Sequence, residues 1–330
     1  MSKPRILRHN LIDHPSVRAW QCLAPGSPVP RAIEVLRISA KSAVYRLHGA
    51  TEGSTLVAKR CPNATGRIER IVYEEILHRS PVPALRLFGS LFDPDGEHCW
   101  LFLENAGLEE YRPASVEHRM IAGRWLGTLE AFAAEAGPFL LPGREPAHYL
   151  SLLRAARDAI RPYGGNRDLP ENPLQTIHDV LNDLDVLESH WDEIESGCAS
   201  FPRTIVHGDL AIKNVRLRGT NGSTTLLAFD WENAGWGVPG SDLAQFTGRT
   251  ISPALDEYRL ANGAFLRGFD DEAVARIADY GRYFRLLDDI TWACCLPADS
   301  PFIFLDNPIA TLAVYHNRLA EAFRESGWSR

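Results

Sequence analysis

The sequence predicts a two-lobed α+β fold: a five-stranded antiparallel sheet with one helix, followed by a mainly α-helical lobe. Between residues 32 and 104, short β-branched and apolar runs alternate with turn signals such as the Asp-Pro-Asp-Gly stretch at 93–96. From Ser115 onward, apolar residues recur at helical spacing. We therefore expect two lobes, 1–104 and 105–330, with residues 1–30 as an irregular lead-in.

The expected elements of the first lobe are short. Its one helix covers about residues 65–79, where Ile68, Val72 and Ile76 form one apolar face and two prolines follow. The five strands are expected at 33–38, 44–47, 54–59, 84–92 and 99–103.

The second lobe is expected to hold a few short strands among longer helices. The strands are the apolar runs at 204–206, 215–217 and 226–228. The helices are expected to begin at Ser115 and to follow near 147–162, 172–195, 240–244, 253–268, 271–295 and 307–326.

Composition excludes several classes of protein. With 45% hydrophobic and 23% charged residues, the 330-residue chain is typical of a globular protein. The six cysteines show no metal-ligand spacing, and no apolar run has the length of a signal peptide or a membrane span. No Lys/Arg run indicates nucleic-acid binding. We expect a cytoplasmic protein with reduced thiols and neither a nucleic-acid nor a membrane partner.

Three polar side chains follow short apolar runs in the stretch that starts at residue 204. Asp209 lies on a turn after the first run, Asn214 precedes the second, and Asp230 ends the third. Phosphoryl transfer needs one carboxylate for the proton of the nucleophile, and an Asn and an Asp that can bind Mg²⁺. This stretch therefore predicts a kinase that acts on a small molecule.

A nucleotide-binding half is expected in the first lobe. Lys59 ends a Leu-Val-Ala-Lys strand of the kind that brings a lysine to nucleotide phosphates, and Glu69 is preferred over Glu74 and Glu75 as its partner. The small-residue turn at 39–43, which includes Ser42, is a weak candidate to bring backbone N–H groups to a phosphate. We expect a hinge at Glu104 and Asn105, whose backbone N–H and C=O groups would be available to a purine edge.

These motifs, in this order, resemble the aminoglycoside phosphotransferase and choline kinase branch of the protein-kinase-like fold. The resemblance rests on His-Gly-Asp-(four residues)-Asn at 207–214, Phe-Asp-Trp-Glu at 229–232 and Gly-Ser-Asp-Leu-Ala at 240–244. It covers about residues 31–250.

The resemblance implies a role for each matching residue. Asp209 would be the catalytic base, and Asn214 and Asp230 would bind Mg²⁺. Lys59, held by Glu69, would neutralise the phosphates of ATP or GTP. His207 and Asp242 would brace the catalytic loop.

The expected acceptor is a small molecule with a hydroxyl group: an antibiotic such as an aminoglycoside, or an amino alcohol or sugar metabolite. The charge distribution suits a neutral or cationic acceptor. Residues 1–105 carry 14 Lys and Arg against 10 Asp and Glu, whereas the remainder carries 21 against 32. Acidic and aromatic residues are candidates for the acceptor pocket: Glu232, Trp236, Asp288, Asp289 and Trp292.

Three other functions fit part of the pattern. A nucleotide-binding pseudokinase that serves as a regulatory or scaffolding module is the main alternative. It is disfavoured because the chain has all five polar residues that catalysis would need: Lys59, Glu69, Asp209, Asn214 and Asp230. A kinase for protein substrates lacks an activation segment, because only eleven residues separate Asp230 from Asp242. Metal-dependent hydrolysis by paired carboxylates would leave Lys59 and the hinge unexplained.

Overall fold

A computed structural model describes residues 5–39, 42–51, 54–94, 96–166, 169–220, 222–263, 265–294 and 306–328. The chain forms two compact units. The first comprises Met1–Tyr111, Phe139–Leu141 and Asn214–Ala234, and the second comprises Arg112–Pro138, Pro142–Lys213 and Gly235–Arg330. This division differs from a single boundary after residue 104 because the hairpin that follows Asn214 packs with the first unit.

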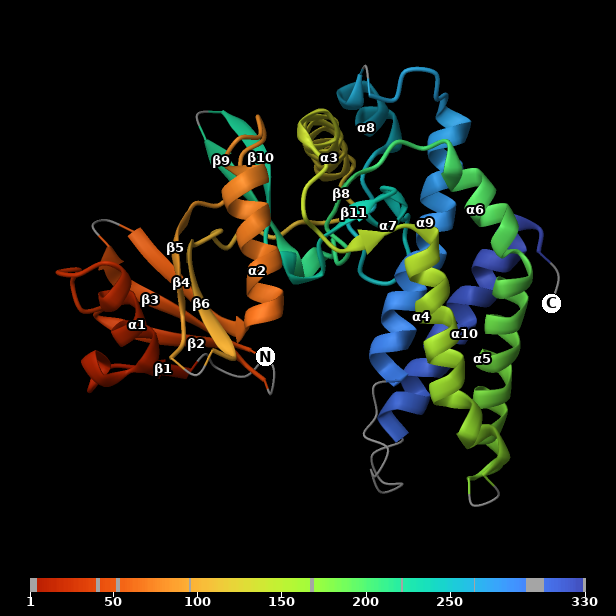
Figure 1. Cartoon of the computed structure of the whole chain (residues 1–330), viewed down its shortest axis with the longest axis horizontal. Coiled ribbons are helices and arrows are strands. Elements are labelled where there is room, and N and C mark those ends of the chain that lie inside the picture. The colour runs from red at the N-terminus through yellow and green to blue at the C-terminus, as the bar shows by residue number, and fades with distance from the viewer. Residues whose placement is uncertain are drawn as a thin grey trace. The chain divides into compact units, whose positions relative to one another are not determined.

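The first unit is built on an antiparallel six-stranded sheet (Figure 1). The strand order is β1-β2-β3-β4-β6-β5. The strands are β1 (Arg5–Leu7), β2 (Ala32–Ile38), β3 (Ala43–Thr51), β4 (Ser54–Pro62), β5 (Leu87–Phe92) and β6 (His98–Glu104). Five of them were expected.

The lead-in at residues 1–30 was expected to be irregular, but its described part, residues 5–30, contains regular elements. It contains β1, a short 3-10 helix η1 (Leu11–Asp13) and helix α1 (Pro15–Leu23). The ring of His14 caps α1 by accepting a hydrogen bond from the Ser16 N–H at 3.3 Å. Trp20 anchors the helix on the sheet, since it donates to the Ala50 carbonyl at 3.2 Å and packs against Phe102. A three-residue strand and a nine-residue helix are too short for their periodicity to be detected.

Helix α2 (Asn63–Ile71), which continues into a π-helical turn η2 (Val72–Leu77), packs against β4 and β6. Side chains alternate along β4, so Ala58 lies in the core shared with Trp20 whereas Cys61 faces α2. The approach is close: a Cβ on Gly66 would lie 2.1 Å from Cys99 Sγ. Lys59 has the same parity as Cys61 and therefore also faces α2.

A hairpin completes the first unit. Strands β9 (Val215–Thr220) and β10 (Ser223–Ala228) pair antiparallel, followed by the short 3-10 helix η5 (Trp231–Asn233). The Leu217 N–H donates to the Glu109 carbonyl at 3.0 Å, which ties the hairpin to the end of the first segment.

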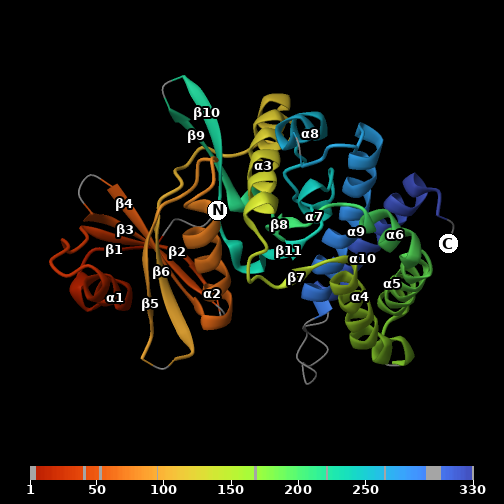
Figure 2. The same ribbon diagram turned by 45° about the horizontal axis from the view of Figure 1, so that its top comes forward.

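In the second unit, helices α4, α5, α9 and α10 run side by side (Figures 1 and 2). The helices are α3 (Val116–Ala136), α4 (Pro146–Ile160), α5 (Glu171–Ser189), α6 (Trp191–Ala199), α7 (Gly240–Leu243), α8 (Leu255–Asn262), α9 (Asp271–Cys294) and α10 (Asp306–Ser326). A small sheet has the order β7 (Gly143–Arg144), β11 (Gly235–Gly237), β8 (Thr204–Val206). Short 3-10 helices follow α4 (η3, Arg161–Gly165) and Asp209 (η4, Ile212–Asn214).

Two helices of the second unit end earlier than the sequence predicts. The helix expected at 172–195 is divided at His190, because the side chains of Ser189 and His190 both hydrogen-bond to the Val186 carbonyl. The helix expected at 253–268 ends at Asn262, where Gly263 has a φ of 52°.

The packing of α9 on α7 predicts a large effect on stability. A Cβ on Gly281 would lie 1.7 Å from the Gly240 carbonyl oxygen, and backbone cannot move aside as a side chain can. We expect Gly281→Ala to lower the free energy of unfolding by about 2–4 kcal/mol. The matched variant Gly165→Ala, where a Cβ meets no atom within 4 Å, should change it by less than about 0.5 kcal/mol. Urea denaturation measures both, and equal values would contradict the packing described.

Candidate active site

Lys59 lies among three carboxylates of the first unit. Its Nζ is 2.6 Å from Glu69 Oε1 and 3.4 Å from Glu232 Oε2, and it also contacts Asp230 Oδ1. The carboxylate oxygens lie within 4.8 Å of one another. We call Glu69, Asp230 and Glu232 the carboxylate cluster. One ammonium faces three carboxylates, so the cluster has an excess of negative charge.

Local structure places each member of the cluster. Lys59 comes from β4 and Glu69 from the face of α2 that packs on the sheet, where it is completely buried. Asp230 ends the third apolar run with a φ of 68°, an unusual conformation for a residue other than glycine. This turn directs the chain into η5, which carries Glu232 and packs against α2.

Burial and charge act in opposite directions on the Lys59–Glu69 pair. Burial lowers the pKa of Lys59, but Glu69, Asp230 and Glu232 outweigh it, so the pKa is raised well above its usual value. Burial raises the pKa of Glu69 to about 7, although the Lys59 ammonium lowers it. Glu69 Oε2 has no hydrogen-bond partner in the described structure. The cluster can therefore accommodate further positive charge.

The hairpin brings Asn214 and Asp230 to the same end of β9 and β10. Val215 pairs with Ala228, and the Phe229 N–H donates to the Asn214 carbonyl at 3.0 Å. Amide and carboxylate oxygens are the donors that Mg²⁺ prefers. The residues present thus fit a hard divalent cation, with the unpartnered oxygen of Glu69 and the negative cluster nearby.

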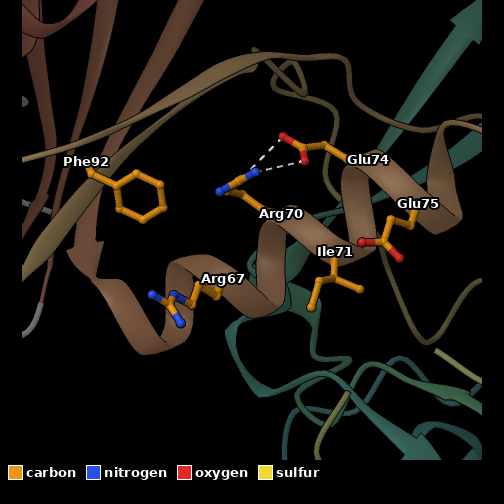
Figure 3. Close-up of a pocket in the computed structure, with 6 residues that line it drawn as sticks. All are labelled: Arg67, Arg70, Ile71, Glu74, Glu75 and Phe92. Carbon is orange, nitrogen blue, oxygen red and sulfur yellow. Dashed lines mark hydrogen bonds and ion pairs between the residues drawn. The ribbon is translucent and has the colours of Figure 1, made fainter. Parts of the chain in front are cut away.

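The alternative partners of Lys59 lie elsewhere. Glu74 of η2 accepts from Arg70 of α2, and the Arg70 guanidinium lies 5.5 Å from the centre of the Phe92 ring. These residues, with Glu75, line a surface hollow (Figure 3). Glu69 lies about one helical turn before Glu74, and its side chain points to Lys59 on the sheet instead. The preference for Glu69 agrees with this geometry.

The expected hinge and turn groups have partners inside the first unit. The Glu104 N–H donates to the Arg86 carbonyl at 2.8 Å, and the Asn105 carbonyl accepts from Arg218 at 3.1 Å. The Ser42 N–H donates to Ser39 Oγ at 3.0 Å. Residues 40 and 41 of the same turn lie outside the described residues. Contacts from these groups to a nucleotide remain predictions.

In the second unit, Asp242 holds the backbone of the loop that carries Asp209. Its carboxylate accepts from the N–H groups of His207 and Gly208, the latter at 3.1 Å. The Asp209 N–H donates to the His207 ring at 3.3 Å. Burial raises the pKa of Asp242 to about 6, although these N–H groups lower it. The geometry matches the bracing expected of His207 and Asp242.

Asp242→Asn is expected to lower nucleotide turnover by about tenfold or more, because an amide NH₂ would face a backbone N–H. The control is Asp256→Asn, at an exposed position of α8. Since the pKa of Asp242 is raised, its contribution to stability is present below about pH 4 and is lost as the pH rises through about 6. The variant should lack this part of the pH dependence of unfolding. Unchanged turnover and an unchanged pH dependence would contradict the bracing role.

Asp209 is held by two cations. Arg285 Nη2 lies 2.9 Å from Asp209 Oδ1, and Lys213 Nζ lies 2.7 Å from Oδ2. Arg285 is buried in α9 and also donates to the Gly208 carbonyl. Burial raises the pKa of Asp209, but Arg285 and Lys213 outweigh it, so the pKa is lowered. The carboxylate is therefore ionised at neutral pH and fixed in orientation.

Arg285 was not predicted from the sequence. A signal was present: an arginine stands within the largely apolar run Tyr-Phe-Arg-Leu-Leu at 283–287, and an arginine on a buried helix face requires a partner. The partner itself could not be identified, because it lies 76 positions away along the chain.

The five candidate acceptor residues have different surroundings. Glu232 belongs to the carboxylate cluster of the first unit. Asp288 lies 3.1 Å from Arg144, and Asp289 lies 3.9 Å from Arg285, so each is next to a cation. Trp292 is 70% exposed, whereas Trp236 lies against Gly137, where a Cβ would be 2.4 Å from its ring.

The antiparallel sheet with its lysine–glutamate pair, and the helical unit with its braced aspartate loop, define a kinase-like phosphotransferase fold. The model of the phosphotransferase enzyme family matches residues 32–278. The chain belongs to this family, and it is a small-molecule kinase. No helix in the described part of the chain is long and apolar enough to span a membrane.

Solved structures share the fold at low sequence identity. The GDP and kanamycin complex of APH(2")-IIia is 12% identical, with a TM-score of 0.63, over 93% of this chain and 98% of that chain. A thermostable mutant of aminoglycoside phosphotransferase APH(4)-Ia is 15% identical, with a TM-score of 0.58, over 90% and 95%. Plasmodium vivax ethanolamine kinase is 14% identical, with a TM-score of 0.53, over 88% and 82%. No significant match to a curated protein is found.

Proposed function

We propose that this protein transfers the terminal phosphoryl group of ATP or GTP to a hydroxyl group of a small molecule, in a reaction that requires Mg²⁺. The observation that carries the proposal is the buried Lys59–Glu69 ion pair next to Asp230. A buried lysine that faces more negative charge than it can neutralise suits a site for a metal and a polyphosphate.

The first unit supplies the nucleotide-binding groups. Lys59, positioned by Glu69, binds phosphate oxygens. Asn214 and Asp230 hold Mg²⁺, which supplies neutralisation of phosphate charge when bound. Ser42, Glu104 and Asn105 remain candidates for contacts to the nucleotide. Among the structural neighbours, one was solved with GDP and another with ADP and hygromycin B. These complexes are consistent with either GTP or ATP as the phosphoryl donor.

The second unit supplies the group that receives the acceptor. Asp209 accepts a hydrogen bond from the acceptor hydroxyl and directs the hydroxyl oxygen toward the phosphorus. Its lowered pKa makes it a weak base, so orientation contributes more than early proton removal. Asp242 and His207 keep the loop in place, and Arg285 keeps the carboxylate in one orientation.

Nucleotide binding and turnover test the proposal. We expect ATP or GTP to raise the melting temperature of the protein only when Mg²⁺ is present, and Asp230→Asn to remove most of this effect. Turnover should increase when an acceptor is added. Metal-independent binding without turnover toward any acceptor would instead indicate a pseudokinase.

A further inference from the structure

The carboxylate of Asp209 lies at the edge of a group of cations in the second unit. Lys213 and Arg285 contact it directly. Two further arginines, Arg249 in the loop after α7 and Arg318 in α10, lie nearby. We call Lys213, Arg249, Arg285 and Arg318 the basic cluster.

Asp289 and Gly248 place Arg318 in this cluster. A Cβ on Gly248 would lie 3.1 Å from Arg318 Nη1 and 3.7 Å from Asp289 Oδ2. Burial raises the pKa of Asp289, whereas Arg285, Arg318 and Lys213 all lower it. Asp289 therefore lies within electrostatic reach of three members of the cluster.

The backbone of the exposed residue Arg249 lies beside the loop that carries Asp209. The Arg249 carbonyl accepts from the Ile212 N–H at 2.9 Å, which joins its loop to the loop that carries Asp209. Burial raises the pKa of the Tyr315 hydroxyl, and Arg318, Arg285 and Arg249 are among the charges that act on it. The Arg318 guanidinium lies 5.9 Å from the centre of the Tyr315 ring.

The carboxylates in this region do not neutralise the cluster. Asp209 is shared by Arg285 and Lys213, whereas Asp288 is matched by Arg144. Asp289 lies beside Arg285 and Arg318, so in the described part of the chain Asp209 and Asp289 are the carboxylates seen to face the four cations of the cluster. In the portion of the chain that the structure describes, neither Arg249 nor Arg318 forms a salt bridge.

We propose that the acceptor carries an anionic group, a carboxylate or a phosphate, which Arg318 and Arg249 bind while its hydroxyl reaches Asp209. This inference rests on the proposed function. Guanidinium groups bind such anions through charge-assisted hydrogen bonds, whereas a polycationic acceptor would be repelled.

The reaction is a direct transfer to the acceptor. The hydroxyl oxygen forms a bond to the terminal phosphorus, the bond from that phosphorus to the bridging oxygen breaks, and the nucleoside diphosphate leaves with its electron pair. The hydroxyl proton passes to Asp209 and then to solvent.

Acceptors matched in size but not in charge test the inference. One set is glucosamine, glucose and gluconate; the other is aminopropanediol, glycerol, glycerate and glycerol phosphate. We expect kcat/KM to be highest for an anionic member, with glycerate and glycerol phosphate distinguishing the carboxylate from the phosphate. A higher kcat/KM for the cationic or neutral members would overturn the inference and leave the proposed function intact. If no compound is phosphorylated and no nucleotide is turned over, both fail.

Two arginines of α10 provide a matched pair of variants. Arg318→Gln should raise KM for the preferred anionic acceptor about tenfold or more, with a much smaller change for its neutral analogue. Arg324→Gln, at an exposed position in the last turn of the same helix, should leave both unchanged. The inference is overturned if Arg318→Gln raises KM for the nucleotide instead, or raises KM equally for acceptors of every charge.

Discussion

Asp209→Asn is expected to lower kcat for phosphoryl transfer by about 10²–10⁴-fold. The amide presents an NH₂ group where the carboxylate accepts a hydrogen bond from the acceptor, and it no longer carries the charge that pairs with Arg285 and Lys213. Asp209 is 18% exposed, so a substrate can reach one side of the group while the cations hold the other. The measurement is the rate of phosphoryl transfer at saturating nucleotide and acceptor.

Nucleotide binding provides the control for this variant. Asp209 belongs to the second unit, whereas the proposed nucleotide-binding groups belong to the first. The affinity for Mg²⁺-nucleotide should therefore change by less than about threefold, since the substitution alters a group that binds the acceptor and leaves the nucleotide-binding groups intact. A variant that keeps kcat within tenfold of the wild type would contradict the role assigned to Asp209.

Lys59→Met is expected to abolish nucleotide turnover and to destabilise the protein by about 3–5 kcal/mol. The substitution leaves Glu69 completely buried without the ammonium that lies 2.6 Å from it, next to two further carboxylates. Removing one partner of a buried ion pair costs more than the pair contributes, because the remaining charge stays desolvated. Urea denaturation measures the loss of stability.

The dependence of this loss on pH has a definite sign. The pKa of Glu69 is raised to about 7 even with Lys59 present, so its contribution to stability is lost as the pH rises through that value. Without Lys59 the pKa rises further, and Lys59→Met should be less destabilising near pH 5 than near pH 8. Adding Glu69→Gln to Lys59→Met should restore much of the stability but not the turnover. Equal destabilisation at the two pH values, with no recovery in the double variant, would contradict this account.

Much of the fold could be predicted because its signals are local. The strands of the first unit alternate with turn residues. In the hairpin, Val215 follows Asn214 directly and pairs with Ala228, which lies two positions before Asp230. The choice of Glu69 followed from its position beside the apolar face of α2. These inferences need only the period of a helix or a strand.

The rest depends on contacts between distant parts of the chain. Arg285 meets Asp209 only because α9 packs beside the catalytic loop, and no local pattern connects the two positions. Likewise, Asp288 was expected to face an acceptor, but the contact with Arg144 arises from a strand in another part of the chain. The sequence shows which side chains are charged, but it does not show which side chain of opposite charge pairs with each of them. The expectation of a neutral or cationic acceptor rested on charge counts, on acidic and aromatic side chains and on the family resemblance, none of which shows how those charges are paired.

The most direct test of the account is the mass of the acceptor after reaction. Purified protein is incubated with Mg²⁺, ATP or GTP and the charge-matched acceptors, and the products are analysed by mass spectrometry. We expect at least one hydroxyl compound to gain one phosphoryl group, about 80 Da, with the wild-type protein, and to do so far more slowly with Asp209→Asn. Nucleotide consumption that yields only inorganic phosphate, at the same rate in both proteins, would contradict it.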